Sequence, residues 1–265
     1  MRKIILSGIL IATTCLMGCG SDKEVVCIPP VEVTPPVEVV PPVESSVIYL
    51  TFDDWSDTWG DMLDMYRDED MQFTFYISQT GGFFNDLSNT AIIFEKMKIG
   101  GHSIGSHTQT HKNLKDVQGK ELRNETELNE ITSYNVLLED ILQQPVTLFA
   151  YPFGAFDSDW DVRLGSHFSQ LRRFGTSNNE PPIYDDVDLS HVDNISSASV
   201  DNAYFNSDQE FYEYVDALSI VLQGGGKSTV LTSHSMSDDT WGITPHRLEY
   251  LLRVMSDNGH VFRAL

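Results

Sequence analysis

The carboxylates and histidines best suited to chemistry gather in three short segments. Asp53 and Asp54 are adjacent, and their charges repel unless a cation offsets one carboxylate and leaves the other free as a base. His107 and His111 are four residues apart, which puts both imidazoles on one side of a helix or a turn-like loop. Two histidines and one carboxylate are a common ligand set for a catalytic divalent metal. His234 has the chemistry of a general acid or base.

Each segment also has an ordinary structural interpretation. An aspartate pair is common at a turn or a helix N-terminus, and two histidines at this spacing also occur by chance. A single histidine is more often a hydrogen-bonded structural residue than a catalytic one, and His102 is interpreted in that way. Taken together, the three segments favour the catalytic interpretation, because each lies at or just after the end of an expected strand.

The elements that position these residues are expected to alternate between strand and helix. Strands are expected at 47–52, 73–77, 103–104, 146–150, 174–176, 229–233 and 260–263. Helices are expected at 57–67, 91–98, 121–142, 162–171 and 211–222, and a last one begins at 244. Repeated strand–helix units indicate parallel strands in a barrel or a doubly wound sheet, both of which build sites at the carboxyl ends of strands. The stretch 178–206 is the least regular, and either a loop or a short strand in a long insertion fits it.

Composition limits the class of protein. The chain has 265 residues, of which 41% are hydrophobic and 21% charged, so it can bury a core. Its net charge is −22, from 17 Lys+Arg against 39 Asp+Glu. That charge repels phosphate backbones and argues against a nucleic-acid partner. No domain boundary is apparent within 47–265, and nothing in the pattern suggests an obligate oligomer, so a monomer is expected.

The N-terminal segment has the pattern of an export signal. Residues 1–3 are basic at two positions, and the apolar run 4–17 that follows is short for a membrane span. The run ends in Leu-Met-Gly-Cys at 16–19, which resembles the lipobox of bacterial lipoproteins. The resemblance implies cleavage after residue 18 and acylation of Cys19. An ordinary signal peptide cut nearby and an uncleaved anchor are the alternatives.

A spacer is expected between the lipid anchor and the folded domain, over 19–46. Pro-Pro-Val-Glu recurs there with a period of six, and such proline-rich sequence favours an extended, semi-rigid conformation. Gly20 stands where an inner-membrane retention signal often has Asp, which favours the outer membrane or the cell surface. All three cysteines lie in the first 27 residues, so 47–265 must fold without disulfides.

Four motifs together resemble one family. They are Thr51-Phe52-Asp53-Asp54, His107-Thr108-Gln109-Thr110-His111, Tyr151-Pro152-Phe153-Gly154 and Leu231-Thr232-Ser233-His234. Their order and approximate spacing are similar to those of the polysaccharide deacetylases, carbohydrate esterase family 4, which have the NodB-homology domain. The resemblance extends over 47–265. It implies an α/β fold, a distorted (β/α) barrel of roughly seven to eight strands.

The resemblance also implies a metal centre with an acid and a base. Asp54, His107 and His111 would hold a divalent metal, with zinc favoured and cobalt, nickel or manganese as alternatives. Asp53 would be the general base and His234 the general acid.

The resemblance further implies a set of residues around the substrate. The backbone amide of Phe153 would bind the oxyanion, Leu231 would line a pocket for the acetyl methyl group, and Tyr151 is included among the substrate-binding residues. Trp55 stands where the family usually has glycine. It would either stack on a sugar ring or pack under the following loop, and Trp241 has the same ambiguity.

Two further features depart from the family pattern. Many members have an arginine two residues before the proline of the third motif, where it pairs with the base, but here that position is Ala150. Without this cation, either another group lowers the pKa of Asp53 or activity is low. The aspartate that orients the acid histidine is not identified, with Asp193 and Asp201 as candidates.

The function implied by the resemblance is removal of acetyl groups from an N-acetylated amino-sugar polysaccharide. Chitin-like polymers, peptidoglycan and poly-N-acetylglucosamine all remain open as substrates. An acetyl-xylan esterase with the same site is the alternative enzyme. A non-catalytic carbohydrate-binding lipoprotein is the alternative outside enzymes, suggested by Ala150. A purely structural envelope lipoprotein does not account for the polar residues at the strand ends.

Overall fold

The fold is that of a computed structural model, which describes residues 44–80, 82–83, 85–116, 120–175 and 180–265, with the side chains of 116 and 120–124 left out. The expected signal peptide, the lipidated Cys19 and most of the proline-rich spacer lie outside these residues.

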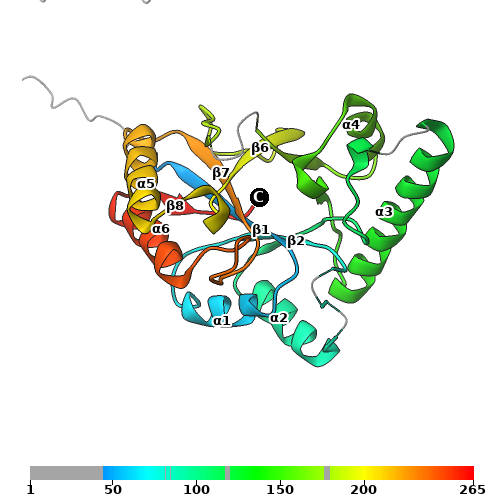
Figure 1. The fold of residues 1–265 in the computed structure, drawn as a ribbon, viewed down its shortest axis with the longest axis horizontal. Coiled ribbons are helices and arrows are strands. Elements are labelled where there is room, and N and C mark those ends of the chain that lie inside the picture. The colour runs from blue at the N-terminus through cyan, green and yellow to red at the C-terminus, as the bar shows by residue number, and fades with distance from the viewer. Residues whose placement is uncertain (1–43, 81, 84, 117–119, 176–179) are drawn as a thin grey trace, which may run out of the picture. The chain divides into compact units, whose positions relative to one another are not determined.

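Seven parallel strands close into a barrel (Figure 1). In order around the ring they are β1 (Val47–Asp54), β2 (Thr74–Ile77), β3 (Ser103–Ser106), β4 (Leu148–Ala150), β5 (Gln170–Phe174), β6 (Asn194–Ser199) and β7 (Ser228–Ser233). β1 pairs with both β2 and β7 and so closes the ring, while β8 (Val261–Phe262) pairs with β1 as an additional strand. The expected distorted barrel is therefore confirmed.

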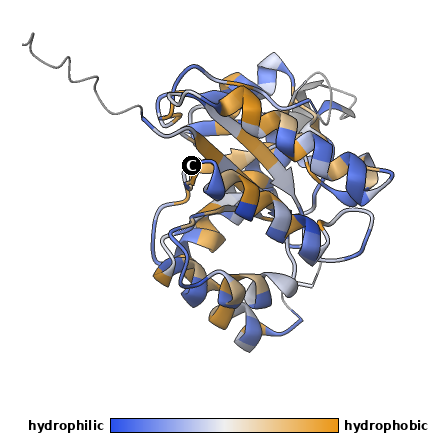
Figure 2. Cartoon of the chain, turned by 90° about the vertical axis from the view of Figure 1, so that its left-hand side faces the viewer, coloured by the Kyte–Doolittle hydropathy of each residue, from blue (hydrophilic) through white to orange (hydrophobic). Residues whose placement is uncertain are grey.

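Helices on the outside of the barrel connect most of the strands (Figure 1). They are α1 (Thr58–Met65), α2 (Leu87–Ile99), α3 (Lys120–Leu142), α4 (Ser158–Leu164), α5 (Asp208–Leu222) and α6 (Pro245–Asp257). In Figure 2, hydrophobic colour is frequent on the strands and on parts of the helices, whereas hydrophilic colour is frequent on the loops and on other parts of the helices. None of the described helices is long and apolar enough to cross a lipid bilayer.

Strand alternation separates the core from the barrel interior. Leu50 and Phe52 of β1 are fully buried in the main hydrophobic cluster under the helices. The intervening Thr51 and Asp53 point the other way, because successive side chains of a strand face opposite sides. Thr51 lies 2.9 Å from the hydroxyl of Thr232 on β7, so the inside of the barrel is partly polar.

The helix starts follow from local capping. Asp86 accepts from the Ser88 and Asn89 amides at the start of α2, and Ser207 accepts from the Glu210 amide at the start of α5. These side chains satisfy backbone donors that have no partner within the helix.

Most expected elements are confirmed, but the expected helix over 162–171 is wrong. α4 ends at Leu164, and residues 170–174 form β5. Phe168 and Leu171 pack in the same small cluster as Leu164, so their apolar spacing imitates a continuing helix. The irregular stretch contains a strand, β6, which fits the second of the two expectations for it.

Candidate active site

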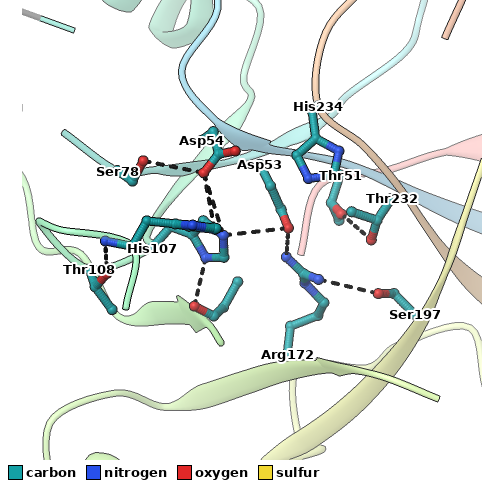
Figure 3. Close-up of polar contacts among 12 residues, drawn as sticks. Thr51, Asp53, Asp54, Ser78, His107, Thr108, Arg172, Ser197, Thr232 and His234 are labelled. Carbon is teal, nitrogen blue, oxygen red and sulfur yellow. Dashed lines mark hydrogen bonds and ion pairs between the residues drawn. The ribbon is translucent and has the colours of Figure 1, made fainter. Parts of the chain in front are cut away.

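Polar side chains meet at the carboxyl ends of the barrel strands (Figure 3). Asp53 and Asp54 end β1, His107 directly follows β3, and His234 directly follows β7. They line a cavity of about 970 Å³. Its described lining residues are Asp53, Asp54, Trp55, Ser56, Thr80, His107, His111, Phe153, Phe174, Asp201, Tyr204, His234, Ser235, Asp239, Thr240 and Trp241.

Asp54, His107 and His111 are arranged as metal ligands. Nε2 of His111 lies 3.3 Å from Oδ1 of Asp54, and Nε2 of His107 lies 3.8 Å from the same oxygen. The candidate ligand atoms all lie within 4.8 Å of one another. Tetrahedral zinc with bonds of about 2.0–2.1 Å holds its ligand atoms roughly 3.3 Å apart. The three side chains therefore fit a small divalent cation after only slight adjustment.

The surroundings of His107 suit a neutral ligand. Its Nδ1 lies 2.8 Å from the carbonyl oxygen of Ala150, so we assign the ring proton to Nδ1 and the free lone pair to Nε2, which faces Asp54. Burial lowers the pKa of His107, although the nearby carboxylates of Asp53 and Asp54 oppose this effect. A histidine must be neutral to bind a metal, and this ring is held in that form.

Left-handed backbone conformations concentrate at the site. Asp54, Thr108, His111 and Phe153 have φ values of 73°, 63°, 52° and 59°, a region that L-residues rarely adopt. Gln143 is the one further non-glycine residue of this kind among those that the structure describes. The hydroxyl of Thr108 accepts the amide of His111 at 2.9 Å and supports the turn. The two histidines thus share a loop, and the strain at these candidate ligands indicates a functional constraint.

Asp53 is 2% exposed and pairs with a buried arginine. Nη2 of Arg172 donates to Oδ2 of Asp53, and Nε2 of His107 lies 3.8 Å from the same oxygen. Burial disfavours the carboxylate, but Arg172 and then His107 and His234 hold its pKa below the usual value. Oδ1 has no hydrogen-bond partner among the described residues. Asp53 is therefore a carboxylate with one oxygen held and the other able to accept a proton.

His234 is paired with Asp201. Its Nδ1 lies 3.0 Å from Oδ2 of Asp201, which is fully buried and also accepts from the hydroxyls of Ser199 and Ser233. Burial opposes the imidazolium, but Asp201, helped by the more distant Asp53 and Asp54, raises the pKa of His234 to about 9. Of the two aspartates considered from the sequence, the structure places Asp201 against His234, whereas Asp193 is exposed beside β6.

The third motif places one aromatic side chain at the cavity and another away from it. Phe153 is 60% exposed, lines the cavity and lies 4.5 Å from His111 between ring centroids. Tyr151 is fully buried, and its hydroxyl donates to Asp161 at 2.8 Å. This placement is contrary to the substrate contact expected of Tyr151, because its side chain packs behind the cavity wall.

The remaining expected substrate residues are mostly packing residues. Leu231 is fully buried in the main cluster and lies outside the cavity lining. Trp55 borders the cavity but is 4% exposed, with its ring against Trp59, Phe83 and Phe94. These contacts favour packing over sugar stacking for Trp55. Trp241, in contrast, lines the cavity and is 56% exposed.

Comparisons with known proteins give a profile match over part of the chain and a similar fold. The sequence profile of the polysaccharide deacetylase family matches residues 41–166. Among curated protein sequences, none matches this chain. The fold is similar to that of the chitin deacetylase of the fungal pathogen Colletotrichum lindemuthianum, with a TM-score of 0.58, 15% identity, and coverage of 83% of this chain and 86% of that one.

Two further solved structures are similar to a comparable extent. The peptidoglycan deacetylase PdaC from Bacillus subtilis gives a TM-score of 0.55 at 16% identity, covering 83% of this chain and 88% of that one. The Xyl-CE4 domain of a multidomain xylanase from the hindgut metagenome of Trinervitermes trinervoides gives 0.56 at 17%, with 84% and 88% covered.

The parallel barrel with its site at the carboxyl ends defines a NodB-like fold. The profile match adds a similarity to the polysaccharide deacetylase family over residues 41–166, and the solved structures of carbohydrate esterase family 4 share the fold. The resemblance to the polysaccharide deacetylases found in the sequence is confirmed by this profile match and by the fold. The profile match ends at residue 166. Arg172, Asp201 and His234 lie beyond the matched range, and it is the folded structure that places them at the site.

Proposed function

We propose that the protein is a metal-dependent deacetylase that hydrolyses the acetamido groups of an N-acetylated amino-sugar polysaccharide. One observation carries the proposal: a paired carboxylate, a charged histidine and an Asp–His–His cluster converge on one cavity. A base, an acid and a metal ligand set are the parts needed for hydrolysis of an amide bond.

The metal ligands in this proposal are Asp54, His107 and His111. Zinc is the favoured metal because two histidines and one carboxylate form a common catalytic zinc site, with cobalt, nickel and manganese as alternatives. When bound, the divalent cation makes water more acidic and polarises the acetyl carbonyl. The proton on Nδ1 of His107 keeps Nε2 directed at the cluster.

The protein side chains account for the proton transfers. Oδ1 of Asp53 takes one proton from the water that attacks the acetyl carbon, because Oδ2 is held by Arg172. The backbone amide of Phe153 donates to the oxyanion that forms. His234 gives the proton on Nε2 to the sugar nitrogen as the carbon–nitrogen bond breaks, since Nδ1 is bound to Asp201. One water is consumed, and acetic acid and a free amine are formed. The acid ionises to acetate, and Asp53 returns its proton and His234 regains one through solvent before the next turnover.

An amide substrate is favoured over an ester. A departing amine needs a proton more than a departing sugar hydroxyl does, and His234 is held as the imidazolium near neutral pH. The structurally similar Colletotrichum and Bacillus enzymes are named for chitin and peptidoglycan. The xylanase domain keeps the acetyl-xylan esterase as the alternative. No lysine or arginine is among the described residues lining the cavity, and four aspartates are, which argues against a strongly anionic polymer.

The substrate class is tested with a panel of polymers. The full chain, loaded with zinc, is incubated with chitin oligomers, poly-N-acetylglucosamine oligomers, peptidoglycan and acetylated xylan, and released acetate is measured. Release from the N-acetylated polymers supports the proposal, whereas release from xylan alone supports the esterase. If zinc binds but none of the four releases acetate, the non-catalytic carbohydrate-binding alternative is favoured.

We propose further that the protein is exported, lipidated at Cys19 and held at the outer membrane or cell surface. The support is the sequence pattern of residues 1–46. Metabolic labelling with a fatty acid tests this, with Cys27→Ala as the matched control. Loss of label in Cys19→Ala alone supports the proposal, and label retained in Cys19→Ala contradicts it.

A further inference from the structure

Arg172 reaches the base from across the barrel. It lies on β5, which is separated from β1 by two strands on one side of the ring and three on the other. Its side chain is fully buried, and the guanidinium meets Oδ2 of Asp53 in the barrel interior (Figure 3). A contact between strands so far apart in the ring exists only when the barrel is closed.

The guanidinium is fixed on several sides. Nη1 lies 3.4 Å from the hydroxyl of Ser197 on β6. Its central carbon lies 5.0 Å from the ring centroid of Tyr76 and 5.4 Å from that of Phe174. Gly105 makes room for the tyrosine, because a Cβ there would lie 2.5 Å from the Tyr76 ring. These contacts hold a planar cation in one orientation.

The neighbouring strand carries Ala150 opposite this arginine. Ala150 of β4 and Arg172 of β5 are register partners, so both face the barrel interior at the same level. Ala150 is the position where an arginine was expected from the family pattern, and it is fully buried with no charge to offer. The cation thus comes from one strand further around the ring.

We propose that Arg172 is the residue that positions the catalytic base Asp53. It supplies the cation that the family's arginine would supply at position 150, where this chain has Ala150. This inference rests on the function proposed above. Arg172 holds Oδ2 of Asp53 and thereby leaves Oδ1 as the oxygen that takes the proton. A buried ion pair is a poor source of stability because both charges lose their hydration, which favours a functional reason for its presence.

The adjacent arginine provides a matched control. Arg173 follows on the same strand but faces the other side, where it lies 3.6 Å from Asp161 and covers the ring of Phe156 at 4.0 Å. It has no contact with Asp53 among those the structure describes. Arg172→Ala and Arg173→Ala therefore remove the same kind of side chain from the same strand. Only Arg172→Ala removes the contact with Asp53.

The experiment compares four variants of the full chain with the wild type. They are Arg172→Ala, Arg172→Lys, the double variant Arg172→Ala with Ala150→Arg, and Arg173→Ala. For each, kcat and KM for acetate release are measured after zinc loading, zinc content is determined, and the crystal structure gives the position of the Asp53 carboxylate. Arg172→Lys and the double variant keep a buried cation beside Asp53. If Arg172→Ala does not fold, these two variants still test the proposal.

The proposal predicts a loss in kcat that a relocated arginine reverses. Arg172→Ala should lower kcat on the order of 100-fold, since a displacement of about 1 Å at a reacting group has that effect. KM, zinc content and Arg173→Ala activity should stay close to the wild type. The kcat of the double variant should be at least about tenfold higher than that of Arg172→Ala, and its Asp53 carboxylate should return to the wild-type position.

Three results would overturn the proposal. They are an Arg172→Ala enzyme with nearly full kcat, an equal loss in Arg173→Ala, and an Asp53 carboxylate that keeps its place without Arg172. The last is decided by the crystal structures alone. If the wild type is inactive on every polymer, the proposed function fails, yet the position of Asp53 in the variants still decides whether Arg172 holds it.

Discussion

Replacing Asp201 with Asn should move the charge of His234 to lower pH. The change removes the carboxylate but keeps an oxygen that can accept from Nδ1, so the ring stays oriented. The ordinary pKa of 6.5 is raised to about 9 in the native site, a difference of about 3 kcal/mol in favour of the imidazolium. With Asp201 neutral, burial of the ring opposes the charge, and the pKa should fall to 6.5 or below.

The direction of the pH effect follows from the acid role. In the proposed mechanism His234 acts when protonated, so we expect activity to be lost as pH rises through its pKa. At pH 8 the protonated fraction should fall from roughly 90% for a pKa of about 9 to roughly 3% for 6.5. The variant should therefore have a kcat about 30-fold lower at pH 8 but close to the wild type near pH 5.5.

Two measurements check this prediction. An NMR titration of the metal-free protein gives the pKa of His234 directly, and the pH profile of kcat for the zinc-loaded protein gives its effect on the reaction. Asp193→Asn is the matched control, because Asp193 is exposed and lies away from His234. An unchanged His234 pKa in Asp201→Asn, or an equal fall in Asp193→Asn, would show that the Asp201 carboxylate does not hold the charge on His234.

Three further predictions concern the cavity walls and the metal. Gly154→Ala should destabilise the protein by about 1–3 kcal/mol in urea unfolding, because a Cβ at φ +62° would lie 2.4 Å from Phe174; unchanged stability would contradict this. Trp55→Ala should destabilise by about 3–5 kcal/mol, whereas Trp241→Ala should raise KM and leave Tm unchanged; the reverse pattern would make Trp55 the sugar contact. His111→Ala should weaken zinc binding by at least about 100-fold in a competition titration with a chelator, and wild-type affinity would exclude His111 as a ligand.

The elements that position the metal cluster were predictable because their signal is local. The buried strand β1 is a run of apolar and β-branched residues that ends at Asp53 and Asp54, and such runs predict a strand directly. The two histidines follow β3 within five residues of its end. Spacing along the chain was enough to bring these side chains together in the prediction.

The residues that support the acid and the base were not predictable in the same way. β6 carries Ser197 and Ser199 on positions that face the polar barrel interior, so it lacks the apolar alternation of a half-buried strand. Arg172 directly followed an expected helix and was assigned to no element, and the Asp53 that it contacts is 119 residues away along the chain. Asp201 meets His234 across 33 residues. Both pairs depend on closure of the ring.

Strand alternation accounts for the misplaced substrate residues. Tyr151 follows Ala150 and packs with Phe149 and Phe156 on the helix side of β4. Leu231 lies in the main cluster on the helix side of β7. A motif identifies residues that belong together in the family, but the register of each strand decides which of them face the cavity.

The central claim is most directly tested by zinc-dependent release of acetate. The full chain is stripped of metal, divided, and incubated with an N-acetylated oligosaccharide with and without added zinc, beside Asp53→Asn treated identically. We expect no release without zinc, restored release with it, and a loss of at least about 100-fold in Asp53→Asn while that variant still binds zinc. Release that persists without metal, or an Asp53→Asn enzyme of undiminished activity, would contradict it.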